Sequence, residues 1–195
     1  MRNELKENLD EAKKVIKKGG LVVFPTETAY GIATDATDRD AVDRVFESKQ
    51  RPQDKGLTVI VDSLETAEEY ARLSDKERKI VDEFMPGPLT LVAEKKNSVP
   101  DNLNSEFAFR ISSGQVASKL SEAGIITATS ANVSGEDTAY SVNDISDELL
   151  DKVDYVLDAG ELEEGPTSTI VEVSEEDLIV HREGPIKKEE IEKVM

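Results

Sequence analysis

The chain has 195 residues, of which 42 are Asp or Glu and 24 are Lys or Arg, so its formal net charge is −18. This sign weighs against sequence-independent binding to nucleic acid, which needs cations to neutralise phosphates. The absence of cysteine excludes disulfides, thiol catalysis and thiolate metal sites. With no apolar run of about 18 residues and no apolar signal-peptide core, we expect a cytoplasmic protein without membrane contact. The acid is expected to form a solvated surface, with adaptation to high salt as the alternative.

The hydrophobic pattern predicts alternating helices and short strands. Leu5, Leu9, Ala12 and Ile16 recur on one helical face, and Gly19 follows them as a helix stop. In chain order the predicted elements are helix 5–16, strand 21–24, helix 38–50, strand 57–61, helix 63–71, helix 74–84, strands 90–94 and 107–111, helix 114–123, strand 125–129, helix 145–150, strands 155–157, 169–173 and 178–182, and helix 187–194. The alternation, with consecutive strands in two places, predicts an α/β fold with a mixed parallel and antiparallel sheet. The length suits a single domain over residues 1–195 without a second C-terminal domain.

Polar clusters follow several of the predicted strands. Pro25 ends the first strand, and Thr26, Glu27, Thr28 and Tyr30 come directly after it. Open α/β sheets bind ligands at strand ends, although an ordinary turn is the alternative. Two further clusters are rich in hydroxyl and amide groups, at 130–134 and at 167–169.

Cations stand at positions where a solvated surface does not require them. Strand alternation places Arg110 on the face opposite Phe107 and Phe109, and Arg182 ends an apolar strand. Each alone is typical of an edge or surface residue. Together they predict a polar pocket whose guanidinium groups suit carboxylate and phosphate, and hence a small anionic ligand that we expect to be phosphorylated.

Several familiar catalytic arrangements are missing. No G-x-x-x-x-G-K-[ST] or G-x-G-x-x-G segment occurs, and the single histidine, His181, is expected to be a packed structural residue. With no cysteine and no other histidine, we expect neither a Ser-His-Asp nor a Cys-His arrangement. An enzyme of this composition would act mainly by positioning and charge stabilisation.

Seven segments in order resemble the YrdC-like family of threonylcarbamoyl-AMP synthases, in its short form, over about residues 12–186. They are FPTETAYG at 24–31, KQRPQDKGL at 49–57, PGPLT at 86–90, FR at 109–110, ATSANVSG at 128–135, STIV at 168–171 and HREGP at 181–185. The resemblance implies a YrdC-like domain with a twisted mixed sheet. It implies a nucleotidyltransferase that converts L-threonine, bicarbonate and ATP to threonylcarbamoyl-AMP and pyrophosphate, the first step of tRNA threonylcarbamoyladenosine modification.

The resemblance also implies roles for individual residues. The catalytic set would be Lys49, Arg51, Ser130 and Asn132. Threonine would be bound by Thr28, Arg110, Ala128 and Ser168, with Arg110 paired to its carboxylate. ATP would be bound by Arg51, Lys55, Ser130, Thr138 and Arg182. Mg²⁺ would accompany ATP, with no side-chain ligand assigned. A downstream tRNA threonylcarbamoyltransferase and a weak tRNA contact are the implied partners.

The sequence departs from the family pattern at three positions near these motifs. Many members carry Pro where Gly56 and Ser112 stand, and a small or hydroxyl residue where Glu106 stands. The alternative is therefore a paralogue of the same fold without synthase activity, acting as a nucleotide-binding or RNA-binding protein or in another carbamoyl transfer. The intact Lys49–Arg51 and Ser130–Asn132 pairs favour the synthase over this alternative.

Overall fold

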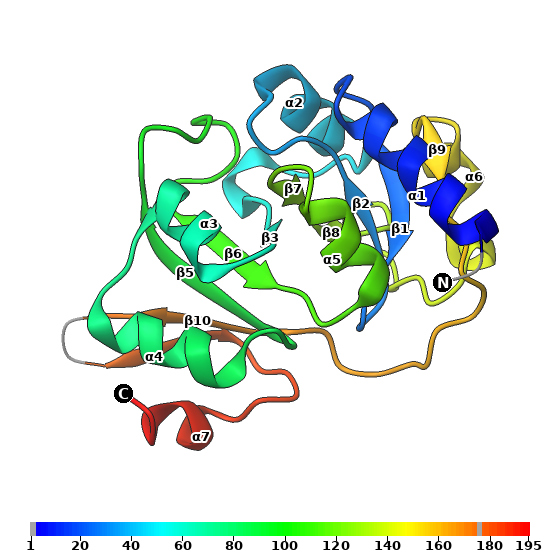
Figure 1. The fold of residues 1–195 in the computed structure, drawn as a ribbon. Coiled ribbons are helices and arrows are strands. Elements are labelled where there is room, and N and C mark those ends of the chain that lie inside the picture. The colour runs from blue at the N-terminus through cyan, green and yellow to red at the C-terminus, as the bar shows by residue number, and fades with distance from the viewer. Residues whose placement is uncertain (1–2, 175–176) are drawn as a thin grey trace.

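The computed structural model describes residues 3–174 and 177–195, and its strands form two sheets (Figure 1). The helices are α1 Asn3–Ile16, α2 Arg39–Ser48, α3 Leu64–Tyr70, α4 Asp75–Phe84, α5 Gln115–Ser121, α6 Asp147–Leu150 and α7 Lys188–Glu192, with 3-10 turns at Gln53–Lys55 and Val142–Asp144. The strands are β1 Val22–Pro25, β2 Tyr30–Ala33, β3 Val59–Val61, β4 Ala71–Arg72, β5 Leu89–Lys95, β6 Phe107–Ile111, β7 Ile126–Thr127, β8 Thr129–Ser130, β9 Tyr155–Val156, β10 Thr169–Val173 and β11 Leu178–Arg182. In this part of the chain, every helix is too short or too polar to cross a membrane.

The predicted α/β fold with mixed strand pairing is confirmed, and the strands divide between two sheets. The smaller sheet has the order β8-β2-β1-β9, and the larger runs β11-β10-β5-β6-β3-β7, with β4 added to β5. In the larger sheet, β5 pairs with β10 in parallel and with β6 in antiparallel fashion. The smaller sheet likewise combines the antiparallel β1–β2 hairpin with the parallel pair β1–β9.

Helix starts follow the capping residues that the sequence offers. The Asp38 side chain accepts hydrogen bonds from the backbone amides at the start of α2, and Ser63 does the same for α3. Ser74 and Glu77 form a reciprocal capping box at the start of α4, as their spacing predicts. These contacts satisfy amides that have no partner within the helix, which is why the predicted starts hold.

The polar cluster after β1 proved to be the tip of a hairpin. Thr26 Oγ1 donates to Ala29 O at 2.7 Å and accepts from the amides of Thr28 and Ala29. This turn sends the chain back antiparallel to β1, with Pro25 opposite Tyr30. Tyr30 therefore begins a buried strand that the sequence analysis did not predict.

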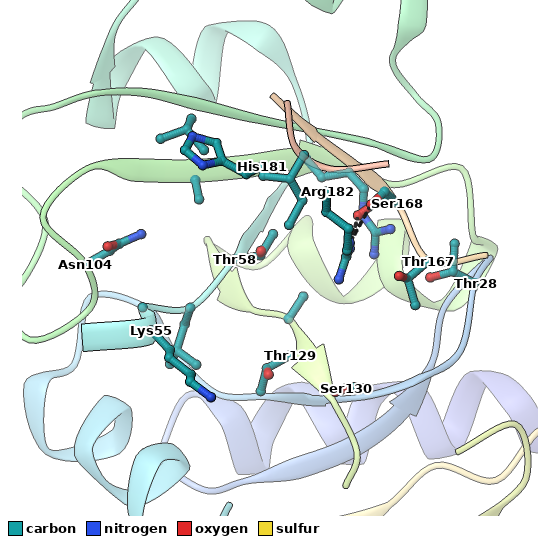
Figure 2. Close-up of a pocket in the computed structure, with 18 of the residues that line it drawn as sticks. Thr28, Lys55, Thr58, Asn104, Thr129, Ser130, Thr167, Ser168, His181 and Arg182 are labelled. Atoms are coloured by element: carbon teal, nitrogen blue, oxygen red, sulfur yellow. Dashed lines mark hydrogen bonds between the residues drawn. The ribbon is translucent and has the colours of Figure 1, made fainter. Parts of the chain in front are cut away.

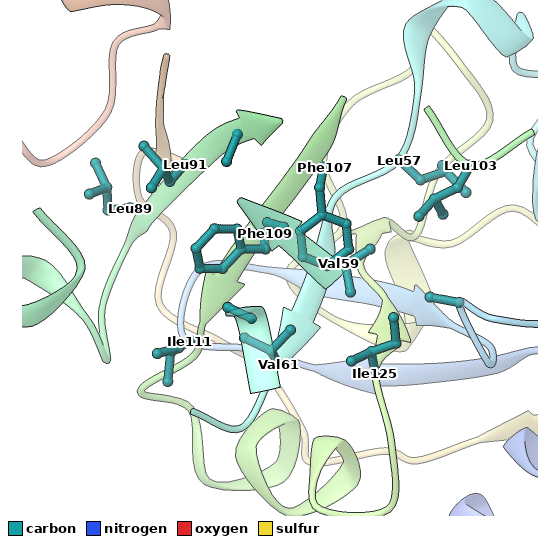
Figure 3. Packing of buried hydrophobic residues seen from close by; sticks show 14 of the residues in the cluster. Leu57, Val59, Val61, Leu89, Leu91, Leu103, Phe107, Phe109, Ile111 and Ile125 are labelled. Carbon is teal, nitrogen blue, oxygen red and sulfur yellow. The ribbon is translucent and has the colours of Figure 1, made fainter. Parts of the chain in front are cut away.

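The larger hydrophobic cluster packs against one face of the sheet that contains β6 (Figure 3). Phe107 and Phe109 point into it, as strand alternation predicts, and their ring centroids are 5.7 Å apart. A second cluster joins α1 and α5 to β1, and Leu9, Ala12 and Ile16 provide the buried stripe of α1. Burial of these apolar faces fixes both sheets and leaves the opposite face of β6 for polar residues.

Candidate active site

One pocket of about 540 Å³ collects most of the residues that the sequence assigned to a site. Its wall comes from the hairpin tip, the 3-10 turn at Gln53–Lys55, β6, β8 and the β10–β11 pair (Figure 2). The assigned residues on the wall are Thr28, Arg51, Lys55, Arg110, Ala128, Ser130, Thr138, Ser168 and Arg182. Lys49 and Asn132 do not line it. In Figure 2, Lys55 and Asn104 lie toward one end, and Thr28, Thr167 and Ser168 toward the other.

Arg110 reaches the pocket from β6 and is only 5% exposed. Its Nη1 atom lies 3.3 Å from Glu27 Oε1 at the hairpin tip. Burial lowers the pKa of Arg110, because desolvation disfavours the charged form, and the Glu27 carboxylate opposes this shift. The expectation that alternation turns Arg110 away from the phenylalanines is confirmed by their burial and by its place on the wall.

Arg182 meets the same end of the pocket from β11. Its Nε and Nη2 atoms donate to the carbonyl and hydroxyl oxygens of Ser168, each at 2.9 Å. Ser168 Oγ is also 3.0 Å from Thr90 Oγ1. Partial burial lowers the pKa of Arg182, and the nearby charge of Arg110 lowers it further. Two guanidinium groups that repel each other form a site that an anion would stabilise.

Gly184 allows the chain after β11 to pack closely against the start of β10. A Cβ atom at this position would lie 2.5 Å from Thr169 N and would also press on the Thr167 carbonyl. No ordinary side chain could be accommodated there without moving the backbone that carries Ser168. This close approach helps to fix Ser168 beside Arg182.

A β-bulge explains why two consecutive residues of β11 face the pocket. Ile170 pairs with Arg182 and Val171 with Val180, so His181 is the extra residue. The expectation of a packed structural histidine is wrong, because His181 is exposed and lines the pocket. Its Nε2 atom lies 2.8 Å from Glu172 Oε2, which belongs to the same wall.

Lys49 lies behind the pocket, where it ties down the segment that carries Ser130. It is 1% exposed, and its Nζ atom donates to Asn132 O at 2.6 Å, to Asn132 Oδ1 at 3.2 Å and to Ser130 O. Burial lowers the pKa of Lys49 to about 7, and the charge of Arg51 adds to this effect. Ser130 Oγ donates to Asn132 Oδ1 at 2.5 Å. Of these three residues, Ser130 is the one that faces the pocket.

Arg51 shapes the loop that presents Lys55. Its Nε atom donates to Gly56 O and its Nη2 atom to Lys55 O, both at 2.9 Å. Gly56 has φ 53° and ψ 177°, which proline cannot adopt, so the departure from the family pattern at this position is matched by the backbone. The loop thereby places the Lys55 side chain on the wall.

The structure adds wall residues to which the sequence analysis gave no role: Thr26, Thr58, Asn104, Thr129, Thr167, Glu172 and His181. Glu106, a second position that departs from the family pattern, is also on the wall. Polarity next to a predicted strand end marked Thr26 and Thr167, whereas the bulge that turns His181 inward left no signal in the sequence. Among the side chains that the structure describes, in residues 7–174 and 177–195, no group of three or more His, Asp or Glu could hold a metal ion.

The chain is similar in sequence to known proteins over most of its length. The Sua5/YciO/YrdC family model, described as "Telomere recombination", matches residues 14–184. A Methanocaldococcus jannaschii protein, provisionally named a threonylcarbamoyl-AMP synthase, is 38% identical over 188 residues, which are 95% of this chain and 90% of that protein. Pyrococcus abyssi threonylcarbamoyl-AMP synthase is 37% identical over 186 residues, covering 92% of this chain and 55% of the relative.

A solved structure gives the same result in three dimensions. The crystal structure of P. abyssi Sua5 complexed with L-threonine has a TM-score of 0.90 and 36% identity. The match covers 96% of this chain and 57% of that one, so the chain spans little more than half of the Pyrococcus protein. From the family match and these identities, the chain belongs to the Sua5/YciO/YrdC family.

Proposed function

We propose that this chain is a threonylcarbamoyl-AMP synthase that converts L-threonine, bicarbonate and ATP to threonylcarbamoyl-AMP, pyrophosphate and water. The observation that carries the proposal is the arrangement of one pocket, whose wall holds Arg182 with Arg110 close to it and Lys55 toward one end. Relatives of matching sequence bear the name of this activity, and one related structure contains L-threonine.

At the guanidinium end, Arg110 binds the threonine carboxylate through its N–H groups. Thr28, Ser168 and the backbone of Ala128 complete the contacts to the amino acid. All four residues line the pocket, which supports this assignment. A buried guanidinium suits a planar carboxylate because it offers two parallel donors in a fixed geometry.

The chemistry joins three molecules that are anionic or become so. The threonine amine attacks the bicarbonate carbon and water leaves, which gives a carbamate. A carbamate oxygen then attacks the α-phosphorus of ATP, and pyrophosphate leaves. Arg51, Lys55, Thr138 and Arg182 bind the nucleotide and offset repulsion between the reacting anions, so catalysis rests on positioning and charge.

Lys49 and Asn132 support this reaction from behind the wall. Because Lys49 bonds both Ser130 O and Asn132 O, we assign both residues the task of holding Ser130 toward the nucleotide. Mg²⁺ enters as part of the ATP substrate, since Mg²⁺ commonly binds through substrate phosphates. The product passes to a tRNA threonylcarbamoyltransferase in the cytoplasm, and tRNA contact by this chain is weak.

The test is pyrophosphate release from Mg–ATP by the purified chain, with threonine and bicarbonate supplied together, singly or not at all. We expect release only when both are present. Arg110→Ala should abolish this release, and Arg72→Ala, which removes an exposed arginine outside the pocket, should leave it unchanged. Release that is indifferent to threonine, or that persists in Arg110→Ala, would contradict the proposal.

A further inference from the structure

Glu27 is a carboxylate that touches the guanidinium end of the pocket without lining it. Its Oε2 atom accepts a hydrogen bond from Ser112 Oγ, and its Oε1 atom lies 3.3 Å from Arg110 Nη1. The Glu27 side chain is 15% exposed and that of Arg110 is 6% exposed. Glu27 can therefore act on a ligand by its charge and by the position it gives to the Arg110 guanidinium.

The turn after β6 holds this carboxylate from a second side. Gly114 N donates to Ser112 Oγ at 3.2 Å. A Cβ atom on Gly114 would lie 2.9 Å from Glu27 N, so the turn packs directly against the hairpin tip. Ser112 stands where many family members carry proline, and its hydroxyl provides the donor that orients Glu27 in this chain.

The contact with Glu27 offsets the charge of Arg110 but leaves N–H groups of the guanidinium without an acceptor. Among the described residues, Glu27 Oε1 and Arg110 Nε are both buried and make no hydrogen bond. The pair therefore lies at ion-pair distance without an aligned hydrogen bond. Arg110 keeps N–H groups for another partner, and an anion in the pocket is the partner that its position favours.

Three charged groups, Arg110, Arg182 and Glu27, sum to a single positive charge. Arg110 and Arg182 contribute two positive charges, and Glu27 contributes one negative charge. Glu172, which is hydrogen-bonded to His181, adds a further carboxylate to the same wall. The Glu27 carboxylate beside Arg110 repels an anion bound there, and it repels phosphate, which carries between one and two negative charges, more than a carboxylate, which carries one.

We propose that Glu27, oriented by Ser112, is a positioning residue that sets the Arg110 guanidinium to select a carboxylate over a phosphate. The inference rests on the proposed function, which assigns the threonine carboxylate to Arg110 and the nucleotide to Arg182 and the residues beyond it. It supplies a physical reason why ATP phosphates do not occupy the threonine site, although both ends are cationic.

The test is a competition measured by calorimetry on the full chain. L-threonine is titrated with and without inorganic phosphate, which gives the threonine dissociation constant and the inhibition constant of phosphate at the threonine site. The variants are Glu27→Gln, which removes the charge, Glu27→Asp, which keeps it, and Ser112→Ala, which removes the orienting hydroxyl. Glu94→Gln, at an exposed position outside this pocket, is the matched control for loss of one carboxylate.

Glu27→Gln should raise the preference for phosphate over threonine about tenfold, as expected when one partly screened charge interaction is lost. Ser112→Ala should shift it in the same direction by a smaller factor, and Glu27→Asp should restore most of the preference for threonine. Glu94→Gln should match the wild type. If Glu27→Gln does not fold, the Ser112→Ala and Glu27→Asp comparisons provide the test.

The possible failures are distinguishable. Threonine binding by the wild type, with an unchanged phosphate preference in the folded Glu27 and Ser112 variants, would overturn this inference alone. An equal shift in Glu94→Gln would also overturn it, because the effect would then be one of total charge. If the wild type does not bind threonine, the proposed function fails and the inference fails with it.

Discussion

At the scale of single residues, the pocket depends on charged groups that burial keeps from their usual solvation. Arg110 is buried beside a carboxylate that does not satisfy all its donors, and Lys49 is buried in a cage of oxygens. The free-energy cost of burying each cation is tolerated because Arg110 presents its guanidinium to the pocket and Lys49 holds the segment that carries Ser130. Buried cations of this kind are more informative than the excess of acid on the surface.

The Lys49 cage predicts a pH-dependent stability. Burial lowers the pKa of Lys49 from 10.5 to about 7 in the folded chain. Between these two pH values the unfolded chain binds more protons than the folded chain, so the free energy of unfolding rises with pH. Below about pH 7 Lys49 is protonated in both states, and this gain in stability is absent. Lys49→Met removes this pH-dependent contribution to the free energy of unfolding. It also leaves the oxygen atoms that accept hydrogen bonds from Lys49 without a donor, and this loss should cost about 2 kcal/mol or more at pH 7.

The measurement is urea unfolding of the wild type and Lys49→Met from pH 6 to pH 9. The difference in unfolding free energy should grow above pH 7 by up to about 1.4 kcal/mol per pH unit. Lys18→Met, at an exposed position, is the control and should show the same small difference at every pH. A Lys49→Met difference that stays constant with pH would contradict the assignment.

At the scale of elements, the loop from Arg51 to Gly56 shows how one backbone conformation places a side chain. Gly56 has φ 53°, a region that residues with a Cβ atom rarely adopt, and a Cβ atom there would lie 2.5 Å from the Asn104 side chain. Gly56→Ala should therefore cost about 1–3 kcal/mol of stability. It should also raise the KM for ATP more than that for threonine, because Lys55 would be displaced.

Chemical unfolding and steady-state kinetics check this prediction. Gly165→Ala is the matched control, because a Cβ atom there meets nothing within 4 Å and its φ lies outside the left-handed region. Its stability and both KM values should stay close to those of the wild type. Equal effects of the two substitutions, or a change confined to the KM for threonine, would refute the role given to this loop.

Local signals predicted most of the elements but did not specify how they pair. Capping residues and hydrophobic periodicity located the helices, because these interactions act within a few residues. Strands β2 and β4 were not predicted from the sequence, and β7 and β8 were predicted as one strand. These short strands are defined by partners far away in the chain, as when Gly31 pairs with Ser130, and pairing over that distance has no local pattern.

The features of the site also fall into those that a local sequence signal predicted and those that depend on distant segments. Alternation along one strand was sufficient to predict the direction of Arg110, and the motifs located most of the pocket wall. The bulge at His181, the cage around Lys49 and the contact from Ser112 to Glu27 each depend on the exact placement of a second segment. Residue types alone could not show these, since each involves side chains that are equally common on a solvated surface.

At the scale of the whole molecule, a chain of net charge −18 gathers cations at one place. Arg51, Lys55, Arg110 and Arg182, four of its 24 lysines and arginines, line a single pocket. Asp54, Glu106 and Glu172 on the same wall offset three of these charges, so anionic substrates meet a slightly positive site within an acidic molecule. The same acidity is consistent with our proposal that any contact with tRNA is weak.

The central claim is that one pocket combines threonine, bicarbonate and ATP, and isotope tracing tests it most directly. The purified chain is incubated with Mg–ATP, L-threonine and ¹³C-bicarbonate, and the nucleotide product is analysed by mass spectrometry. Our account predicts threonylcarbamoyl-AMP that carries one ¹³C atom, in amounts equal to the pyrophosphate released. An unlabelled threonyl adenylate, or pyrophosphate release without a labelled product, would contradict it.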